Sequence, residues 1–240
     1  MKKAVTLIVI GLIIGVGYAF LGDAGYSGKF DTTNMKLLFS EDFETGLNFA
    51  TGNRSEDMRL RTSDRQCLSK STEQKNEGTQ SLCIDPKPLK FGSLSINKTL
   101  PWRDVYLVEF DLFVVSHYKC INENLKSKVA SSIYNLFSTS NQHVVAFRED
   151  GKVYCCGKKV RSWEPGKWYH VKYRVETVND SNNIQVYLDV NGSKCSVYNI
   201  DVSFRERKRS KNHTHWPYLS LSILCMPCYI DNLKIYASNE

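Results

Sequence analysis

Long helical segments are missing from this sequence. From Lys36 onward, no stretch keeps apolar residues at the 3.6-residue period of a helix for long, which excludes a helical bundle. The 240-residue chain also lacks an internal repeat, a low-complexity tract or a Pro/Ser-rich linker that would divide it, and we expect one domain over residues 36–238. With 42% hydrophobic and 24% charged residues, the composition is that of a globular protein.

The one long apolar run lies at the N-terminus. Lys2 and Lys3 precede an uncharged run over residues 4–21, the layout of an export signal. Small residues near its end suit a signal peptidase, and its 18-residue length also reaches the lower limit for a membrane-spanning helix. Residues 1–22 are therefore predicted to form a hydrophobic helix, either a signal peptide or a membrane anchor, and residues 23–35 a tether. Both alternatives export the rest of the chain.

Cysteines and glycosylation motifs agree with export. Eight cysteines, an even number, usually form disulfides outside a reducing cytoplasm. Five Asn-x-Ser/Thr sequons permit N-glycosylation. The cysteines are Cys67, Cys83, Cys120, Cys155, Cys156, Cys195, Cys225 and Cys228, and the sequons begin at Asn53, Asn97, Asn179, Asn191 and Asn212.

Short runs in which apolar residues recur at every second position predict strands. The clearest runs cover residues 104–116, 167–176 and 183–200, and Asn191-Gly192 closes a hairpin within the last. Further strands are expected at 36–44, 65–70, 79–84, 91–97, 129–138, 142–148, 151–156, 216–224 and 229–237. About a dozen strands without a helix predict an all-β, two-sheet antiparallel sandwich.

Three groups of residues resemble a known family. They are LLFSEDFETG near the start, WEPGKWYHVKYRVE followed by IQVYLDVNG in the middle, and YIDNLKIY at the end. Together they resemble the laminin-G-like, or concanavalin A-like lectin/glucanase, jelly roll. The resemblance implies that the first and last strands lie together and that Trp168, after the Pro165-Gly166 turn, is scaffold that closes one end of the core. The family includes lectins, sugar-binding modules, glycosidases, polysaccharide lyases and adhesion domains.

The resemblance makes Glu109 and Asp111 the first candidates for catalysis. Retaining glycosidases of this fold carry two glutamates and an aspartate along one strand, and Glu109 and Asp111 have the required spacing. The second glutamate is missing, because Phe113 and Val114 stand at the next positions. Without a proton donor the pair cannot expel a sugar, and we interpret both residues as a solvent-facing pair on a strand.

Two candidate metal sites follow from carboxylates and histidines. Family members often bind a structural Ca²⁺ between the first and last strands, and the resemblance places Asp42 and Asp231 there; the alternative is two edge carboxylates that face water. His213 and His215 have the spacing of two zinc ligands on a strand, but their surroundings predict a solvated loop. No other cofactor is expected.

A basic segment surrounds these histidines. The chain has a net charge of +7, of which Lys2 and Lys3 contribute two, so its bulk charge is only mildly basic. The segment can hold an anionic glycan or envelope polymer, or it is an ordinary surface loop; nucleic acid is not expected. Its candidate ligand-binding residues are Arg205, Arg207, Lys208 and Arg209.

Cys225 and Cys228 have the spacing of a redox Cys-x-x-Cys motif. That chemistry needs a thiolate at the N-terminus of a helix, and here a strand follows at once. We expect instead a structural bridge, local or to other strands.

For the other cysteines, the sequence indicates few disulfide pairings. Cys155 and Cys156 are adjacent in a predicted strand and should point to opposite faces, each pairing elsewhere. Cys67 with Cys83 would clip a hairpin, and the remaining pairings stay open.

The leading hypothesis is an exported, non-catalytic module that binds carbohydrate or another extracellular surface ligand. A glycoside hydrolase or polysaccharide lyase of the same fold is the first alternative, and an Arg/Lys/Tyr cluster on the binding face would favour it. A structural cell-envelope or virion surface protein is the second. The aromatic candidates for ligand binding are Trp102, Trp163, Trp216 and Tyr218.

Overall fold

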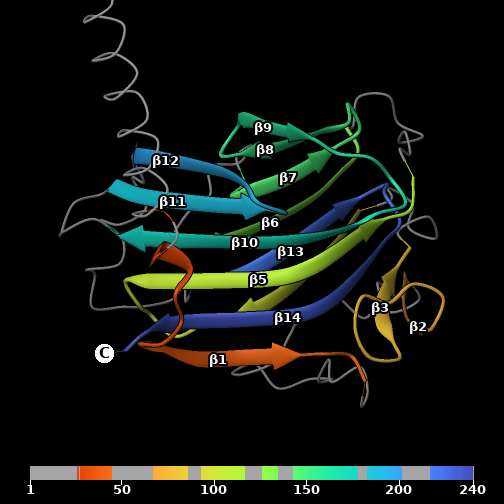
Figure 1. Cartoon of the computed structure of the whole chain (residues 1–240), viewed down its shortest axis with the longest axis horizontal. Helices are drawn as coiled ribbons and strands as arrows, with labels where there is room; N and C mark the ends of the chain where they lie inside the picture. Colours follow the sequence, from red (N-terminus) through yellow and green to blue (C-terminus); the bar gives the residue numbers. More distant parts are fainter. Residues whose placement is uncertain are drawn as a thin grey trace, which may run out of the picture.

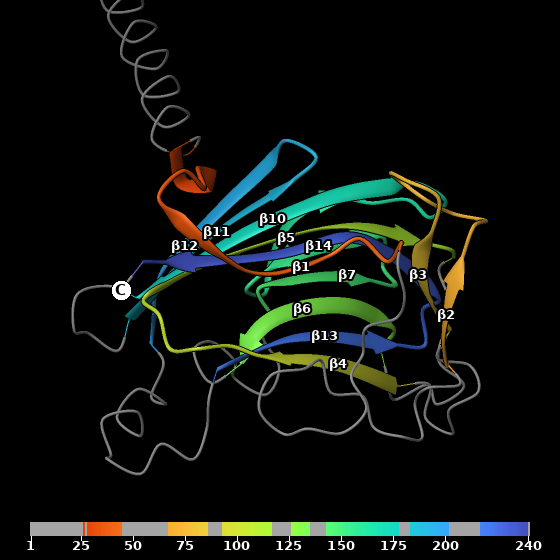
Figure 2. The same ribbon diagram turned by 90° about the horizontal axis from the view of Figure 1, so that it is seen from below.

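Two antiparallel sheets stack face to face, as the layers in Figure 2 show. This is a computed structural model, which describes residues 26, 28–44, 67–85, 93–116, 126–134, 143–177, 183–201 and 217–239. The predicted all-β sandwich is confirmed. The predicted N-terminal helix lies outside the described residues, and within them no helix has the length and apolar character needed to cross a bilayer.

The larger sheet faces the viewer in Figure 1. Its long central strands carry the alternating patterns that predicted them, and neighbouring strands are antiparallel throughout. In spatial order it contains β12 (Ser193–Asp201), β11 (Asn183–Val190), β10 (Trp168–Thr177), β5 (Val105–Val114), β14 (Cys228–Ser238), β3 (Ser81–Ile84) and β2 (Leu68–Ser71), and β1 (Met35–Glu41) also pairs with β14.

The smaller sheet lies behind it. It consists, in spatial order, of β4 (Ser93–Thr99), β13 (Tyr218–Leu224), β6 (Lys128–Tyr134), β7 (Val145–Arg148), β8 (Lys152–Cys155) and β9 (Lys158–Ser162). Strand β9 was not predicted, because its sequence KKVRS contains a single apolar residue and so shows no alternation of apolar and polar positions.

β1 and β3 share one edge of β14. β1 pairs with the C-terminal half of β14, where Glu41 lies opposite Leu233, and β3 pairs with the N-terminal half, where Leu82 lies opposite Ile230. The first and last strands are therefore neighbours, as the resemblance implied. Between the two pairings, β14 carries a bulge at 231–234, and Asp231 and Asn232 have no strand partner on that edge among the described residues.

The core lies between the sheets. On β5, the alternate residues Tyr106, Val108, Phe110, Leu112 and Val114 point inward and are at most 2% exposed, which confirms the alternation predicted over residues 104–116. Neighbouring strands of both sheets contribute similar rows of Val, Ile, Leu and Tyr. Burial of these side chains is the main driving force for closing the two sheets on each other.

One polar link crosses this core. The hydroxyl groups of Tyr173 on β10 and Ser131 on β6 lie 2.8 Å apart, and both residues are buried. Burial raises the pKa of Tyr173 above its usual range. The bond satisfies both hydroxyl groups in an otherwise apolar interior and fixes the two sheets in one relative position.

Trp163, not Trp168, closes one end of the core. Trp163 is 3% exposed, packs on Phe147 with ring centroids 5.9 Å apart, and donates its indole N–H to the carbonyl of Arg148 at 2.9 Å. The prediction of Trp163 as a ligand-binding residue is therefore wrong, because its only polar atom bonds to the backbone. Trp168 points out of the sandwich, since its neighbour Tyr169 takes the inward position of β10.

The predicted hairpin turn at Asn191-Gly192 is confirmed. Val190 pairs with Ser193, and the two residues between them have φ values of 46° and 80°, which the turn requires and which Asn and Gly tolerate. The side chain of Asn191 accepts a hydrogen bond from the backbone N–H of His170 at 2.6 Å. The turn is thereby attached to β10.

The segment before β1 contacts the larger sheet. Lys29, in the short helix η1 (Gly28–Phe30), forms an ion pair with Glu176 at 3.2 Å, and its carbonyl accepts a hydrogen bond from Arg174 at 2.9 Å. Figure 1 shows this orange segment in front of the sheet. Part of the predicted tether therefore lies on the sheet, where it covers one end of the outer face.

Candidate functional site

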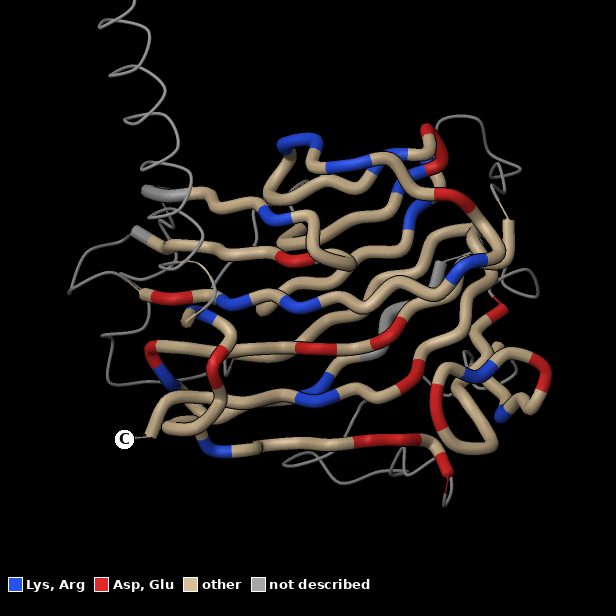
Figure 3. The backbone as a smooth tube through the Cα atoms, in the orientation of Figure 1, with Lys and Arg blue, Asp and Glu red and all other residues tan. Residues whose placement is uncertain are grey.

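The outer face of the larger sheet carries cross-strand rows of side chains. Each row takes one residue from β10, one from β5 and one from β14, because the antiparallel registers of these strands align their outward positions. Figure 3 shows acidic positions on β5 between basic positions on β10 and β14. We name three rows by their side chains: the aromatic row is Trp168–Phe113–Tyr229, the His–Asp row is His170–Asp111–Asp231, and the Lys–Glu row is Lys172–Glu109–Lys234.

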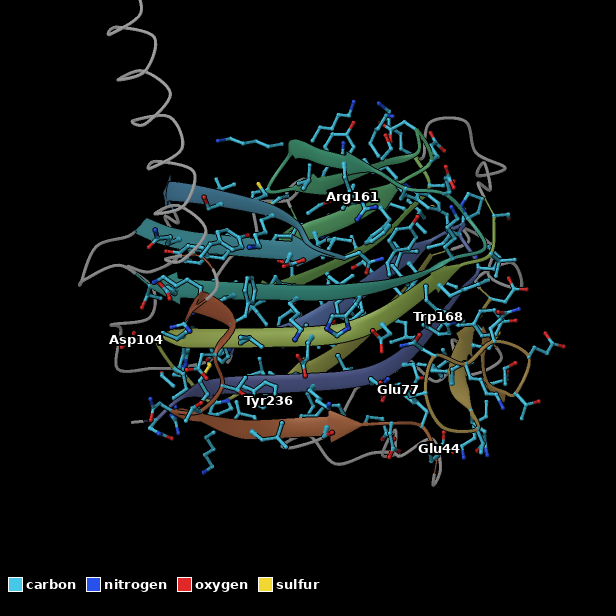
Figure 4. The ribbon with its side chains drawn as sticks, viewed as in Figure 1. Glu44, Glu77, Asp104, Arg161, Trp168 and Tyr236 are labelled. Carbon is cyan, nitrogen blue, oxygen red and sulfur yellow. The ribbon has the colours of Figure 1, made fainter. Side chains whose placement is uncertain are left out.

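The aromatic row is a continuous surface of three rings. The ring centroid of Phe113 lies 5.5 Å from that of Trp168 and 5.9 Å from that of Tyr229, in tilted and edge-to-face arrangements. Trp168 and Phe113 are only partly buried. The interpretation of Trp168 as a core plug is wrong: it stands on the outer face, near the loop that carries Glu77 (Figure 4).

The His–Asp row contains a buried carboxylate and an exposed imidazole. The Nδ1 atom of His170 lies 2.6 Å from Oδ1 of Asp111, and the two side chains are 48% and 4% exposed. The side-chain amides of Asn76 and Asn232 donate hydrogen bonds to Oδ2 of Asp111, at 3.0 and 2.8 Å. Both oxygens of this carboxylate are therefore occupied by donors.

These donors determine the protonation of Asp111. Burial by itself would raise its pKa, but the hydrogen bonds from His170, Asn232 and Asn76 outweigh burial, so the pKa of Asp111 lies below its usual value. At neutral pH the carboxylate is ionised and can only accept hydrogen bonds. His170 therefore donates from Nδ1, which leaves Nε2 as the nitrogen available to a ligand.

Asp231 anchors a loop beside this pair. Its Oδ2 accepts hydrogen bonds from the backbone N–H groups of Asn76 and Glu77, at 3.2 and 3.3 Å, and its Oδ1 accepts one from Asn232 at 2.9 Å. Asp231 is 1% exposed, and burial raises its pKa despite these bonds. The bulge in β14, with Asn232 at a φ of 51°, turns the Asn232 side chain toward Asp111.

The same loop, residues 72–80 between β2 and β3, is held at its other end by Glu44. The carboxylate of Glu44 accepts hydrogen bonds from the backbone N–H groups of Thr79 and Gln80, at 2.7 and 2.9 Å. Between the two anchors, Gly78 has a φ of 63°, and a Cβ atom there would overlap Oε1 of Glu44. The loop is thereby fixed over the edge of the His–Asp row.

The Lys–Glu row lies beside the His–Asp row on the face. Oε2 of Glu109 lies 3.2 Å from Nζ of Lys172, and Oε1 lies 3.7 Å from Nζ of Lys234. The hydroxyl of Tyr236 lies 3.5 Å from the same Oε1, at the limit of a hydrogen bond. Both lysines keep part of their surface, at 34% and 41% side-chain exposure, so their ammonium groups remain accessible to a ligand.

The interpretation of Glu109 and Asp111 as a solvent-facing pair is wrong. Asp111 is buried under three donors, and Glu109 is a half-buried partner of two lysines. The position of the missing glutamate is occupied by Phe113, the centre of the aromatic row. An arrangement in which one carboxylate attacks and another donates a proton is therefore absent from this part of the described face.

The proposed calcium ligands do not fit a cation. Asp231 uses both oxygens on backbone N–H groups, which are donors and so have the wrong polarity for a neighbouring cation. Asp42 is exposed and accepts a hydrogen bond from the backbone N–H of Glu44 at 3.0 Å. Within the described residues there is no group of three or more His, Cys, Asp or Glu side chains placed to hold a metal.

The other predicted ligand-binding residues are not brought to this face. Trp102 packs against the core, and Tyr218 lies on β13 of the smaller sheet. Of the sequons, Asn191 is exposed in its hairpin turn and Asn97 is half-buried on β4. Predicted residues outside the described part of the chain are Trp216, Arg205, Arg207, Lys208, Arg209, His213, His215, Asn53, Asn179, Asn212 and Cys120.

The predicted cysteine pairings need correction. Cys67 packs in the core while Cys83 is half-buried and lies outside that cluster, so the two thiols do not clip the β2–β3 hairpin. Cys225 is disulfide-bonded, but Cys228 is a buried free thiol, which excludes a local bridge between them. The structure has free thiols at Cys83, Cys155, Cys156, Cys195 and Cys228.

Sequence reasoning missed His170, Asn76 and Asn232. His170 lies within the predicted strand over residues 167–176, but the pairing of that strand with β5 was not predicted. Had it been, the register would have placed His170 opposite Asp111. Asn76 and Asn232 come from a loop and a bulge, for which alternation gives no signal.

No family model matches the chain, and no curated protein matches its sequence. Similar structures do exist. A cellulose-induced protein, Cip1, aligns with 84% of this chain and 97% of its own, at 12% sequence identity and a TM-score of 0.52. The catalytic domain of a GH131 beta-glucanase from Podospora anserina aligns with 85% of this chain and 97% of its own, at 12% identity and a TM-score of 0.48.

A lectin shows the same likeness. The winged bean acidic lectin, in complex with methyl-alpha-D-galactose, aligns with 86% of this chain and 100% of its own, at 12% identity and a TM-score of 0.43. Identities this low compare folds and carry no residue-level correspondence. The likeness to Cip1, together with the two stacked antiparallel sheets and the adjacent first and last strands, shows that this chain has the fold of that protein, in agreement with the expected jelly roll.

Proposed function

We propose that the protein is exported and binds a carbohydrate on the outer face of its larger sheet. The observation that supports this is the juxtaposition of the aromatic row with the His–Asp and Lys–Glu rows. Sugars present an apolar C–H face and a rim of hydroxyl groups, and a binding site for them needs a ring surface beside fixed polar groups. Neighbouring strands of one sheet supply both here.

The ring surface is centred on Trp168 and Phe113. Both are partly exposed, and Phe113 is held between Trp168 and Tyr229, so little conformational entropy is lost when a ligand packs on them. The hydroxyl of Tyr229 is itself directed to Glu73, at 3.3 Å. We expect the apolar face of one sugar ring to lie on Trp168.

The polar groups next to these rings are preorganised. His170 is oriented by Asp111, and Lys172 and Lys234 are oriented by Glu109. Acidic and basic side chains nearly balance in these rows, so the face does not require an anionic ligand. We therefore expect a neutral oligosaccharide to bind, with an affinity that depends little on salt concentration.

A glycan array probed with the full-length chain tests this proposal. Trp168→Ala should lower the affinity for the bound glycan by about fivefold to thirtyfold, because one buried ring–sugar contact corresponds to about 1–2 kcal/mol. Tyr154→Ala is the matched control, since Tyr154 is a half-buried aromatic residue on β8 of the other sheet. Its affinity should equal that of the unmodified chain.

Two outcomes would contradict the proposal. One is an array on which the folded chain binds nothing. The other is an equal loss of affinity in Trp168→Ala and Tyr154→Ala, which would place the ligand elsewhere. Circular dichroism of both variants excludes unfolding as the cause.

The Asp111–His170 pair favours a polysaccharide lyase as a second candidate function. An imidazole held by an ionised carboxylate is the arrangement of a general base, and Lys172, Lys234 and Tyr236 form the basic and phenolic surroundings that an elimination needs. In such a reaction Nε2 of His170 would take the proton next to the carboxylate of a uronic acid, and a lysine would offset the charge of that carboxylate. A carbon–carbon double bond would form as the bond to the glycosidic oxygen breaks, and the leaving oxygen would take a proton from the Tyr236 hydroxyl or from water.

An ultraviolet assay for the unsaturated product of elimination, run over a panel of uronic-acid polymers, separates the two functions. His170→Gln should abolish product formation and leave glycan binding within about threefold of the unmodified chain, because only one hydrogen bond to the ligand changes. If no polymer of the panel yields the unsaturated product, carbohydrate binding remains the proposed function of this face.

A further inference from the structure

Three cysteines meet where the two sheets come together at one side of the sandwich. Cys155 is the last residue of β8, Cys156 follows it in a turn, and Cys195 lies on β12. Cys155 and Cys156 are buried, and Cys195 is half-buried against the core. This cluster is separate from the outer face and takes no part in the proposed function.

The turn explains how adjacent cysteines come to be on the same side. Strand β8 ends at Cys155, so Cys156 does not follow the alternation of the strand. Its φ is 49° and that of Gly157 is 84°, the values of a tight hairpin turn. Both thiols consequently face the interior, with their sulfur atoms 4.0 Å apart. The prediction that they point to opposite faces is wrong for this reason.

Cys195 approaches the pair from the other sheet. β12 is the edge strand of the larger sheet and contacts both β8 and β9, which form the edge of the smaller one. On β12 the inward positions are Cys195 and Val197, and Cys195 lies opposite the buried Leu188 of β11. The thiols of Cys155 and Cys195 are hydrogen-bonded to each other.

We propose that Cys155 and Cys195 form a disulfide that joins the two sheets, and that Cys156 remains a thiol. Cys155 and Cys195 are in contact across the interface, come from different strands and both face inward. A bond between Cys155 and Cys156 is disfavoured, because adjacent residues lie about 3.8 Å apart at Cα, whereas disulfides usually span about 4.4–6.8 Å.

The bond requires an oxidant, and a small disulfide such as oxidised glutathione supplies it. One thiolate, from Cys155 or Cys195, attacks the glutathione disulfide and releases one glutathione thiolate. The second cysteine thiolate then attacks the mixed disulfide and releases the other. Two protein thiols are oxidised, one glutathione disulfide is reduced to two glutathione molecules, and the two thiol protons pass to the released thiolates.

Buried thiols oxidise slowly, which fixes the conditions of the test. The hydrogen bond with Cys156 and burial raise the pKa of Cys155, and the bond with Cys155 raises that of Cys195, so few thiolates exist in the closed protein. The bond should therefore form while the chain folds. The full-length chain is refolded in a glutathione redox buffer, and its free thiols are then alkylated.

Mass spectrometry of a non-reduced digest should show one cross-linked pair containing Cys195 and the peptide of Cys155 and Cys156. Variants assign the partner: Cys156→Ser should keep the cross-link and Cys155→Ser should lose it, while Cys83→Ser, a half-buried cysteine on β3, is the matched control and should keep it. A cross-link that survives in Cys155→Ser, a Cys155–Cys156 bridge, or complete alkylation of Cys195 in the unmodified chain would each overturn the proposal.

Thermal unfolding provides an independent readout. The bond closes a loop of roughly 40 residues, and reducing it should lower the unfolding midpoint of the unmodified chain by roughly 5–15 °C. Because reductant also opens the disulfide of Cys225, the shift in unfolding midpoint that reductant causes is compared between the unmodified chain and a variant. In Cys195→Ser the reductant should produce a clearly smaller shift than in the unmodified chain. Equal shifts would contradict an inter-sheet bond.

Discussion

The outer faces of the two sheets differ in the size of their side chains. The larger sheet presents long charged and aromatic residues, such as Trp168, His170 and Lys172. Charged and aromatic residues such as Arg148 and Tyr154 also lie outward on the smaller sheet, toward β8, but at its centre four outward positions carry buried Ala or Ser. They are Ala130 and Ser132 on β6, Ala146 on β7 and Ser220 on β13.

This difference shows that alternation along a strand sets only which side chains face outward. What those side chains can do depends on their length and on their cross-strand neighbours. Small outward residues cannot reach a ligand, whereas the rows on the larger sheet combine rings, carboxylates and ammonium groups within hydrogen-bond distance of one another. At their centres, therefore, the larger sheet has the chemistry of a binding face and the smaller sheet does not, within the described residues.

The largest effect is expected at the buried carboxylate of the larger sheet. Asp111→Ala removes the acceptor of three side-chain donors and should lower the free energy of unfolding by about 3 kcal/mol, as measured by urea denaturation. Asp104→Ala is the control: Asp104 is exposed, and its carboxylate accepts a hydrogen bond from the Thr177 hydroxyl at 2.8 Å, so its loss should cost less than about 1 kcal/mol. Equal losses of unfolding free energy in the two variants would contradict the conclusion that Asp111 is buried and Asp104 is exposed.

The smaller sheet should respond to pH in a different range. Burial, reinforced by Lys128 and Arg148, lowers the pKa of His143 from 6.5 to about 4. The unfolded chain therefore binds this proton at a higher pH than the folded chain. The free energy of unfolding should fall as the pH drops from about 6.5 to about 4, by roughly 3 kcal/mol or less.

His143→Gln should flatten this part of the pH profile. Asp111 is an acid, not a base, but it too destabilises the folded chain as the pH falls. Its pKa is lower in the folded chain than in the unfolded chain, where it is about 4. The stability that this difference contributes above pH 4 is therefore lost as the pH falls further. Asp111→Asn should remove only that lower limb. Urea titrations at a series of pH values, with both variants, separate the two; a profile unchanged by His143→Gln would contradict the assignment.

A smaller effect is expected at the link between the sheets. Tyr173→Phe leaves the hydroxyl of Ser131 without its partner in the core and should cost about 1 kcal/mol in unfolding free energy. In the double variant with Ser131→Ala, the combined loss should be smaller than the sum of the two single losses, since both remove the same bond. Strictly additive losses would show that the two hydroxyl groups do not interact.

The smallest effect is expected for Ser220→Ala on the outer face of the smaller sheet. Its hydroxyl lies 3.4 Å from that of Ser222, a weak hydrogen bond, so the free energies of unfolding and of glycan binding should each change by less than about 0.5 kcal/mol.

Lys234→Ala should likewise leave stability nearly unchanged, because the ion pair of Lys234 with Glu109 is partly exposed, but it should weaken glycan binding. Equal glycan affinities in the two variants would remove the proposed distinction between the faces.

Much of the fold could be predicted from the sequence. The alternation in β5, β10 and β11 assigns inward and outward residues correctly, and Asn191-Gly192 identifies its turn, because both signals are local. The placement of Trp163 and Trp168 was inverted, since either side of a Pro-Gly turn can face the core and only the packing of Phe147 and Tyr169 decides which does.

The site was less predictable because it depends on pairing. Glu109 and Asp111 were found as candidates, but their partners come from β10, β14 and the loop at 72–80, far away in the chain. The outcome for Asp111 reversed an expectation: a carboxylate assigned to solvent is buried because His170, Asn76 and Asn232 together satisfy it. Such a set of donors cannot be identified before the register of three strands is known.

The bulge in β14 has a consequence for how this face can vary. Asp231 faces outward with its carboxylate, Asn232 adds a second outward side chain, an amide, and Leu233 and Lys234 then resume the usual order of inward and outward positions. Removing Asn232 would regularise the strand while every following side chain kept its side of the sheet. An amide of the ligand face can thus be gained or lost by insertion or deletion of a single codon, without rebuilding the interior.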